Sequence, residues 1–554
     1  MKTFAFLTLA GIATSALLGC ADDFCDKVDC EGTGGNAASS SSTSQGPGGT
    51  TSTSSSQPTS SSTQSGGGDG GSSVSSGDTG GGGDGGHGGS GAGGDGGGGS
   101  AAGCNLAEDQ TVGDDCGVFV NSDYDGPQQT GSKSQPFKTL AQAIGAADSG
   151  DTIYVCDSAG HDEAVTIETD LTLVGGFGCT NWGWTAAGRT AWRAEANDIP
   201  LTVTSAASVS LSNFDIAASD ATVSGSSSIA IFAVSATLEI DLCDISAGQG
   251  ADGESESIAS AELKAPDGTP GTDGCDGDAS TPGVDGGENS CRGTPRDGGP
   301  SGAGQNNVTF GGNATQGAPL NGGGTGGLGE GAGPGGQCSN GGPGAPGTFG
   351  EPGTGAPDDA HGILGPSGFV PASGTTGMPG TPGSGGGGGG GANLCNGAGP
   401  SGGGGGAGGC GGNIGVAGGG AGASVAIVAF NSGLTLLNTI LATSDGGRGG
   451  NGAPGQPGQP GGDGREAGGN GGGACPGGSG GSGGQGGSAG GGRGGHSVGI
   501  IWTGDDAPDL TAEVAFDKGD PGGGGDGGVG SDGPNAATEG APGSNENVLE
   551  VDAL

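Results

Sequence analysis

The sequence predicts a mainly β fold, a parallel β-helix with a short N-terminal capping helix and long Gly-rich insertions that we expect to be disordered. Three observations lead to this prediction. They are a helix-to-strand stretch at Pro136 to Val155, a series of short strands between Cys104 and Ser246, and an internal repeat interrupted by Gly-rich sequence. Because 150 of the 554 residues are glycine and only 3% are aromatic, we expect the core to occupy a minority of the chain.

The stretch Pro136 to Val155 first shows helical and then strand periodicity. Its apolar residues recur at the spacing of one helix face: Phe137, Leu140, Ala141, Ile144 and Ala147. Pro136 suits the first helical turn. Thr152 to Val155 is β-branched and aromatic and is bounded by turn residues, which predicts a buried strand.

Short strands bounded by Gly, Ser, Asp or Asn continue to Ser246. The candidates are Thr152 to Val155, Ala164 to Ile167, Leu171 to Val174, Leu201 to Thr204, Val209 to Leu211, Ile229 to Val234 and Leu238 to Leu242. A sandwich of short strands is the alternative all-β fold. The helix followed by evenly spaced strands favours the β-helix.

Two segments resemble known families. Pro136 to Val155, PFKTLAQAIGAADSGDTIYV, resembles the N-terminal start of pectate-lyase-like right-handed parallel β-helices, which implies a capping helix and a right-handed first coil. Leu173 to Trp184, LVGGFGCTNWGW, resembles a GGFxCxxW element of Gly-rich (PGRS-like) surface lipoproteins of myxobacteria. Enzymes of the first family use calcium-binding Asp residues with an Arg base, or clustered Asp with Gly-His-Gly and Arg-x-Lys. Neither set is found in this sequence, so we predict no catalytic residue and no cofactor, and favour a protein that is not an enzyme.

His161 is the one histidine in the strand-rich segment. It precedes Asp162 and Glu163, so an acid/base role is conceivable in chemical terms. Its place after the first predicted strand instead indicates an exposed turn histidine.

An internal repeat links the strand-rich segment to the Gly-rich sequence. Ser228 to Ile245 aligns without gaps on Ser424 to Leu441, and a weaker third copy starts at Ser497 and continues through Phe516. We expect the copies to be successive coils, with the Gly-rich blocks extruded from one turn position. Lengthening a turn from about 10 to about 180 residues costs only about 2.6 kcal/mol.

The Gly-rich blocks contain G-x-y runs too brief for a collagen triple helix. A disordered chain with local polyproline geometry is the expectation, and bundled polyglycine helices are the alternative, for which no regular repeat length is seen. The resulting divisions are 1–19 signal peptide, 20–103 lipid anchor and Ser/Thr/Gly tether, 104–246 β-helix, 247–423 insertion, 424–443 returning coil, 444–496 insertion, 497–518 final coil and 519–554 acidic tail.

Residues 1–20 indicate export. The apolar run ends in Leu-Leu-Gly-Cys, which looks like a bacterial lipobox and predicts acylation of Cys20, with a plain secretory signal as the alternative. Several acyl chains would anchor the protein in the lipid bilayer. Ala21 favours the outer membrane or cell surface.

Cysteine usage agrees with an oxidising compartment. Thirteen of the fourteen Cys follow Cys20, so at least one stays unpaired within the chain. Cys156 and Cys179 each follow a strand about one coil apart, and stacked strands bring Cα atoms within disulfide range. We therefore predict that bridge, together with Cys104–Cys116 and Cys25–Cys30.

The formal net charge of −46 argues against nucleic-acid partners and permits only weak association with divalent cations. The sequence therefore favours a non-catalytic, lipid-anchored surface protein, adhesive or structural, that displays an acidic Gly-rich surface. The alternative is a β-helix protein that binds or cleaves extracellular polysaccharide. For that alternative Trp182 and Trp184, with Trp192 nearby, are the candidate sugar contacts.

Overall fold

The computed structural model describes residues 104, 106, 111–156, 160–257, 264–275, 280–306, 309–331, 337–393, 397–470, 473–530 and 536–554. All of them belong to one compact unit, Asp95–Leu554. The signal peptide, Cys20, the tether and the predicted Cys25–Cys30 bridge lie outside the described residues.

The described chain is mainly β. After the single 3-10 turn at Asp114–Cys116 comes strand β1 (Val118–Asn121), and the helix α1 (Leu140–Ala146) follows. The helix begins with a capping box, because the Thr139 side chain accepts the Gln142 amide while the Gln142 side chain accepts the Thr139 amide. It lies inside the predicted helical stretch and packs Leu140 and Ala143 on the core.

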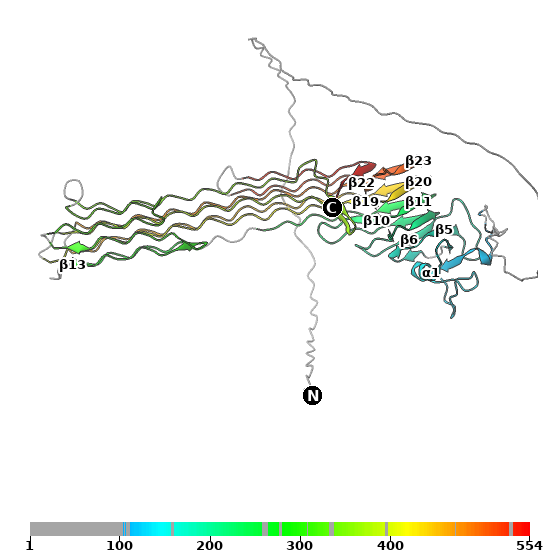
Figure 1. The fold of residues 1–554 in the computed structure, drawn as a ribbon, viewed down its shortest axis with the longest axis horizontal. Helices are drawn as coiled ribbons and strands as arrows, with labels where there is room; N and C mark the ends of the chain where they lie inside the picture. Colours follow the sequence, from blue (N-terminus) through cyan, green and yellow to red (C-terminus); the bar gives the residue numbers. More distant parts are fainter. Residues whose placement is uncertain are drawn as a thin grey trace, which may run out of the picture. The chain divides into compact units, whose positions relative to one another are not determined.

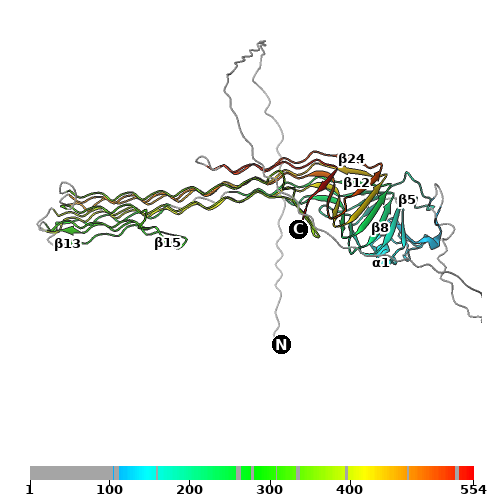
Figure 2. The same cartoon turned by 45° about the horizontal axis from the view of Figure 1, so that its top comes forward.

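Three parallel sheets make up the strand-rich part of the described chain (Figures 1 and 2). Sheet 1 has the order β1-β2-β5-β8-β11-β20-β23, with β2 (Thr152–Cys156), β5 (Leu171–Phe177), β8 (Ser208–Ser212), β11 (Thr237–Asp241), β20 (Gly433–Leu437) and β23 (Asp509–Ala512). Sheet 2 has the order β25-β22-β19-β10-β7-β4, with β4 (Val165–Ile167), β7 (Leu201–Val203), β10 (Ser228–Val234), β19 (Ser424–Phe430), β22 (Ser497–Thr503) and β25 (Val548–Glu550). Sheet 3 has the order β24-β21-β12-β9-β6-β3, with β3 (His161–Asp162), β6 (Thr190–Arg193), β9 (Phe214–Ala217), β12 (Asp244–Ala247), β21 (Ile440–Thr443) and β24 (Ala515–Lys518).

The chain visits these sheets in a fixed rotation. From β3 onward, successive sheet strands belong to sheet 3, then sheet 2, then sheet 1, and the cycle repeats through β25. The repeat predicted from the sequence sets the register, since Ser228 pairs with Ser424 and Ser424 with Ser497. Each Gly-rich block leaves after a strand of sheet 3 and returns to a strand of sheet 2, so the prediction of one common turn position is confirmed.

The main hydrophobic core lies between the three sheets. Alternate residues along the strands point inward, and Leu211, Ile231 and Ile245 are all buried there. A second cluster lies on the other side of sheet 2 and includes Phe232 and Val428. It is covered by a hairpin of β17 (Ile363–Gly365) and β18 (Gly368–Val370), and β26 (Asp552–Ala553) pairs with β17.

The prediction of disordered Gly-rich insertions is wrong for the described residues. Segments from 248–257 to 536–547 lie side by side and are hydrogen-bonded to one another; we call this part the glycine bundle (Figure 1). Within it, short antiparallel pairs join β13 (Ser280–Thr281) to β16 (Gly304–Gln305) and β14 (Ser290–Cys291) to β15 (Thr294–Pro295).

Hydrogen bonds between bundle segments recur every third residue. The amides of Gly383, Gly386 and Gly389 donate to the carbonyls of Gly409, Gly406 and Gly403. Gly409, Gly412 and Gly415 in turn donate to carbonyls of the segment 473–496, again at a spacing of three. Three residues per turn is the period of polyproline II geometry, in which the backbone groups point away from the segment axis and are free to bond neighbours.

Close packing explains the seven consecutive glycines at 385–391. A Cβ on Gly388 would collide with the carbonyl of Pro300, one on Gly386 with Gly478, and one on Gly387 with Thr325. At the remaining four positions of the run, a Cβ would collide with backbone of the same three neighbouring segments, in the same order. A segment with neighbours on all three faces therefore needs glycine at every position.

The same segment changes composition where it has fewer neighbours. In the stretch 374–383 glycine falls only on every third residue, and each of these glycines faces the carbonyls of 481–490. The intervening Thr375, Thr376 and Met378 are exposed. The glycine pattern thus records how many faces of each segment are covered.

Four disulfides link described cysteines. Cys104–Cys116 and Cys156–Cys179 are the pairings predicted above. Cys291–Cys410 and Cys338–Cys475 join segments of the glycine bundle. Cys243 is buried and free, and burial raises the pKa of its thiol to about 12.

Candidate functional site

A polar depression of about 430 Å³ adjoins the GGF segment of β5. The register between β2 and β5 shifts between Tyr154 and Cys156, because Gly175 and Gly176 add a bulge to β5. Gly176 has a φ of 79°, a conformation that favours glycine. The chain then makes an excursion through 178–188 that the Cys156–Cys179 disulfide ties to the sheet.

Polar groups from this excursion and from the start of β6 line the depression. Asn181, Thr185, Arg189 and Thr190 contribute side chains. Arg189 Nη1 donates to the carbonyls of Ala186 and Gly188, and its buried Nε makes no hydrogen bond. Asp244 Oδ2 lies 3.8 Å from that Nε and offsets its charge. The arrangement offers amide, hydroxyl and guanidinium groups with little net charge, which suits a neutral polyhydroxyl ligand better than an anion.

The tryptophans predicted as sugar contacts lie mostly in the core. Trp182 is 6% exposed and meets Phe119 edge-on at 4.8 Å between ring centroids. Trp192 is fully buried and donates its Nε1 proton to the Glu163 carbonyl. Trp184 is half-buried with its Nε1 atom enclosed. Trp182 and Trp192 thus have no free face on which a sugar ring could stack.

His161 is not the exposed turn residue expected from the sequence. It is 2% exposed, with Nε2 3.3 Å from the Cys156 carbonyl and Nδ1 3.8 Å from Glu163. The Glu163 carboxylate accepts the amides of Leu140 and Ala141 at the start of α1. Burial opposes ionisation of Glu163, but these hydrogen bonds together with the one to His161 lower its pKa overall. The pair therefore joins the capping helix to the sheets.

Acidic side chains on the bundle act as hydrogen-bond acceptors for amides of neighbouring segments. Asp252 accepts the amide of Arg448, and Asp267 accepts that of Asp463. The amide of Asp463 and the ammonium of Lys264 lower the pKa of Asp267. Each acceptor and its donor are 196 residues apart, the same offset that relates β10 to β19. The gap-free repeat in the sequence has this same offset, but its continuation into the Asp residues of the bundle was not predicted.

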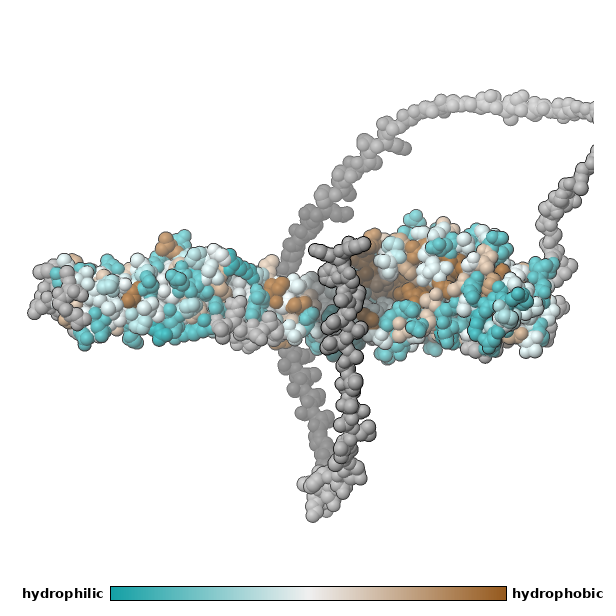
Figure 3. Space-filling view, turned by 90° about the horizontal axis from the view of Figure 1, so that it is seen from below, coloured by the Kyte–Doolittle hydropathy of each residue, from teal (hydrophilic) through white to brown (hydrophobic). Residues whose placement is uncertain are grey.

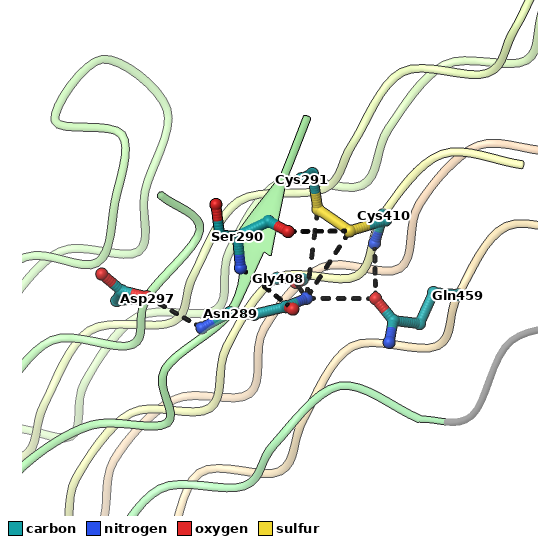
Figure 4. The surroundings of a disulfide bond; sticks show 7 residues. All are labelled: Asn289, Ser290, Cys291, Asp297, Gly408, Cys410 and Gln459. Carbon is teal, nitrogen blue, oxygen red and sulfur yellow. Dashed lines mark hydrogen bonds between the residues drawn. A yellow bond between two sulfur atoms is a disulfide. The ribbon is translucent and has the colours of Figure 1, made fainter. Parts of the chain in front are cut away.

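The Cys291–Cys410 disulfide lies within a polar network in the bundle (Figure 4). Asn289 Nδ2 donates to the Gly408 carbonyl at 2.7 Å and to Gln459 Oε1 at 3.0 Å. Gln459 Oε1 also accepts the Cys410 amide at 2.9 Å. Three segments of the bundle are therefore joined at this point by one covalent bond and several hydrogen bonds.

A second polar cluster lies where the bundle meets sheet 2. It contains His361, Arg493, His496 and Ser544, which we call the junction cluster. Arg493 Nη1 donates to the carbonyls of Pro357 and Asp358, and His496 Nε2 lies 2.6 Å from the His361 carbonyl. Sequence reasoning missed this cluster, since its members are spread over some 180 residues. The one signal in the sequence is that His496 stands directly before β22, the first strand of the third repeat copy.

Within the described ranges, no group of three His, Cys, Asp or Glu side chains could hold a metal ion. No helix of the described chain is long and apolar enough to cross a membrane.

Comparisons with known proteins add no assignment to these sites. No protein-family model matches the chain, and the searches of curated proteins and of solved structures found no match.

Proposed function

We propose that this chain is a non-catalytic, lipid-anchored protein of the outer membrane or cell surface, with an adhesive or structural role. In this proposal the three sheets form a right-handed parallel β-helix, and the glycine bundle grows from one of its turns. Acylated Cys20 and the Ser/Thr/Gly tether would hold both in the envelope.

The glycine bundle is the observation that carries the proposal. Its interior is glycine backbone, so its larger side chains lie on the outside, as Thr375 and Met378 do. In the face shown in Figure 3, apolar residues gather over the sheets, and the bundle presents mainly polar residues and glycine. The glycine bundle therefore devotes a large share of the chain to exposed surface. The whole chain carries a formal net charge of −46, which favours an acidic and well-hydrated surface.

Replacing Cys20 by serine tests the anchor. We expect the full chain to fractionate with membranes and to be cut by protease added to intact cells. Cys20→Ser should instead be found in the soluble fraction, because no acyl chain can be attached. Cys25→Ser is the matched control and should remain with the membranes. Membrane retention of Cys20→Ser would contradict the lipid anchor.

Polysaccharide binding is the second candidate, and the depression beside Arg189 favours it. We expect a neutral polysaccharide, if one binds there, to lose about tenfold in affinity in Arg189→Ala, since one good hydrogen-bonded contact contributes on the order of 1.4 kcal/mol. The exposed Arg292→Ala is the control. The assay is a panel of neutral and acidic polysaccharides scored for binding and for new reducing ends. New reducing ends would overturn the non-catalytic role, and equal binding by Arg189→Ala would exclude this depression.

A further inference from the structure

The hairpin of β17 and β18 is held over sheet 2 by groups whose hydrogen bonds depend on protonation. Leu364 and Phe369 of the hairpin belong to the apolar cluster that contains Phe232, Val428 and Ile501 of sheet 2. The polar attachments of the same segment come from the junction cluster and from β26, which pairs with β17. We propose that residues 357–370 form an acid-released flap, which uncovers this apolar face of sheet 2 when His496 takes up a proton. This goes beyond the proposed function, because it makes the exposure of an apolar surface depend on acidity.

Both ring nitrogens of His496 are engaged in the closed arrangement. Nδ1 accepts the Ser544 amide at 2.8 Å, so the proton of the neutral ring is on Nε2, which donates to the His361 carbonyl. A second proton would have to go on Nδ1, where it would face the Ser544 N–H. The Phe369 ring packs against His496 at 5.8 Å between centroids and keeps water from that side. The closed flap therefore requires neutral His496.

His361 joins the cluster from the hairpin side. Its Nδ1 lies 3.3 Å from Ser544 Oγ and 3.4 Å from Arg493 Nη2. Because the guanidinium of Arg493 can only donate, Nδ1 is the acceptor of that contact.

The surrounding charges come from each segment packed on the cluster. Arg493 lies on the bundle segment that leads into β22, and Asp358 and Asp359 precede the hairpin. Glu550 and Asp552, from the chain end, line a small pocket with Asp359 and His361. These carboxylates are near His361, whereas His496 is buried beside Arg493. His496 is therefore the histidine whose protonation the closed flap opposes most.

The direction of the pH effect follows from His496. Burial lowers its pKa to about 4 from the 6.5 of a free histidine, and the charges of Arg493 and His361 act in the same direction, although the hydrogen bond to the His361 carbonyl opposes them. A lowered pKa in the closed form means that the contribution to closing is complete above pH 6.5 and is lost as the pH falls toward 4. For an open form that titrates normally, the opening equilibrium constant rises about 30-fold at pH 5.

Hydrogen exchange on the full chain tests the flap. After correction for intrinsic rates, amides of 357–370 should lose about 30-fold in protection between pH 7.5 and pH 5. Bundle amides, such as those of 401–409, should keep theirs. Unchanged protection of the hairpin would overturn the proposal, and so would an equal loss in the bundle, since that would mean general unfolding.

Two histidine variants test whether His496 is the group whose protonation opens the flap. His496→Gln keeps a donor and an acceptor but cannot titrate, so its hairpin protection should differ little between pH 7.5 and pH 5. His161→Gln removes a histidine that is equally buried but distant in the sequence, and it should retain the full pH dependence. A full loss of protection at pH 5 in His496→Gln would contradict the assignment. If that variant fails to fold, the comparison of hairpin and bundle amides in the unmodified chain still decides the proposal.

Discussion

Gly388→Ala is expected to destabilise the glycine bundle by about 3 kcal/mol, at the upper end of the usual cost of overpacking. The added Cβ would lie within 3.0 Å of the Pro300 carbonyl. Gly388 is also bonded through its amide to Thr315, so the segment cannot move away without losing a buried hydrogen bond. Hydrogen exchange of the amides in 297–303 and 385–391 would measure the loss of stability.

Thr376→Ala is the matched control for this substitution. Thr376 is four turns of three residues before Gly388 and points in the same direction, but it is exposed. We expect its removal to change stability by less than about 0.5 kcal/mol. If Gly388→Ala were as mild as Thr376→Ala, the covered-face explanation of the glycine run would be wrong.

Removing the Cys291–Cys410 disulfide is expected to cost about 4 to 5 kcal/mol. The bridge closes a stretch with a sequence separation of 119, and the loss of chain entropy on cross-linking the unfolded chain grows with loop length. The figure is an upper value, because Cys338–Cys475 already restrains part of the same sequence. The double substitution Cys291→Ser with Cys410→Ser should unfold the bundle at lower denaturant concentration, with the hydrogen bonds of Asn289 and Gln459 remaining (Figure 4).

The Cys104–Cys116 bridge provides the comparison. Its sequence separation is 12, for which the same reasoning gives about 3 kcal/mol. Its loss should affect the region around β1 and leave bundle amides protected. A larger effect on the bundle from this pair than from Cys291–Cys410 would contradict the role of the latter as the bundle's cross-link.

The strand-rich part could be predicted because its signals are local or repeat at one offset. Pro136 to Val155 carries helical and strand periodicity in adjacent windows, and α1 and all but the last residue of β2 lie within it. The gap-free alignment of Ser228 to Ile245 on Ser424 to Leu441 is the register of the paired strands. Side-chain alternation and repetition can both be read directly from the amino-acid sequence.

The glycine bundle could not be predicted in the same way. Its stabilising bonds join backbone groups of segments far apart, and glycine has no side chain to record which neighbour it meets. The usual entropic argument against order in Gly-rich sequence applies to one segment alone. Here the buried amide of Gly389 bonds to Gly403, and that of Gly403 bonds to Cys475, so each segment orders the next. The signal was the change from G-x-y before residue 384 to unbroken glycine after it.

The candidate sites could not be predicted from the sequence, for a related reason. Trp182 and His161 belong to residue types found both at sites and in cores, and sequence spacing does not distinguish the two. Their contacts show that both residues belong to the core. Trp182 packs on Phe119, and His161 contacts Glu163 and the Cys156 carbonyl. His496 and His361 are 135 residues apart, and their contact follows from the return of the chain to sheet 2.

The period of three constrains how the gene for this protein can change in length. Inserting three codons into one limb of an excursion, and three into the limb it pairs with, would extend the bundle by about 9 Å and leave each residue on its former face. Inserting one or two codons would turn the rest of that limb by a third of a revolution or more, and would bring side chains such as Thr376 or Thr375 onto the face now occupied by Gly377, Gly380 and Gly383. Natural variants of this bundle should therefore differ in length by multiples of nine nucleotides, distributed over paired limbs.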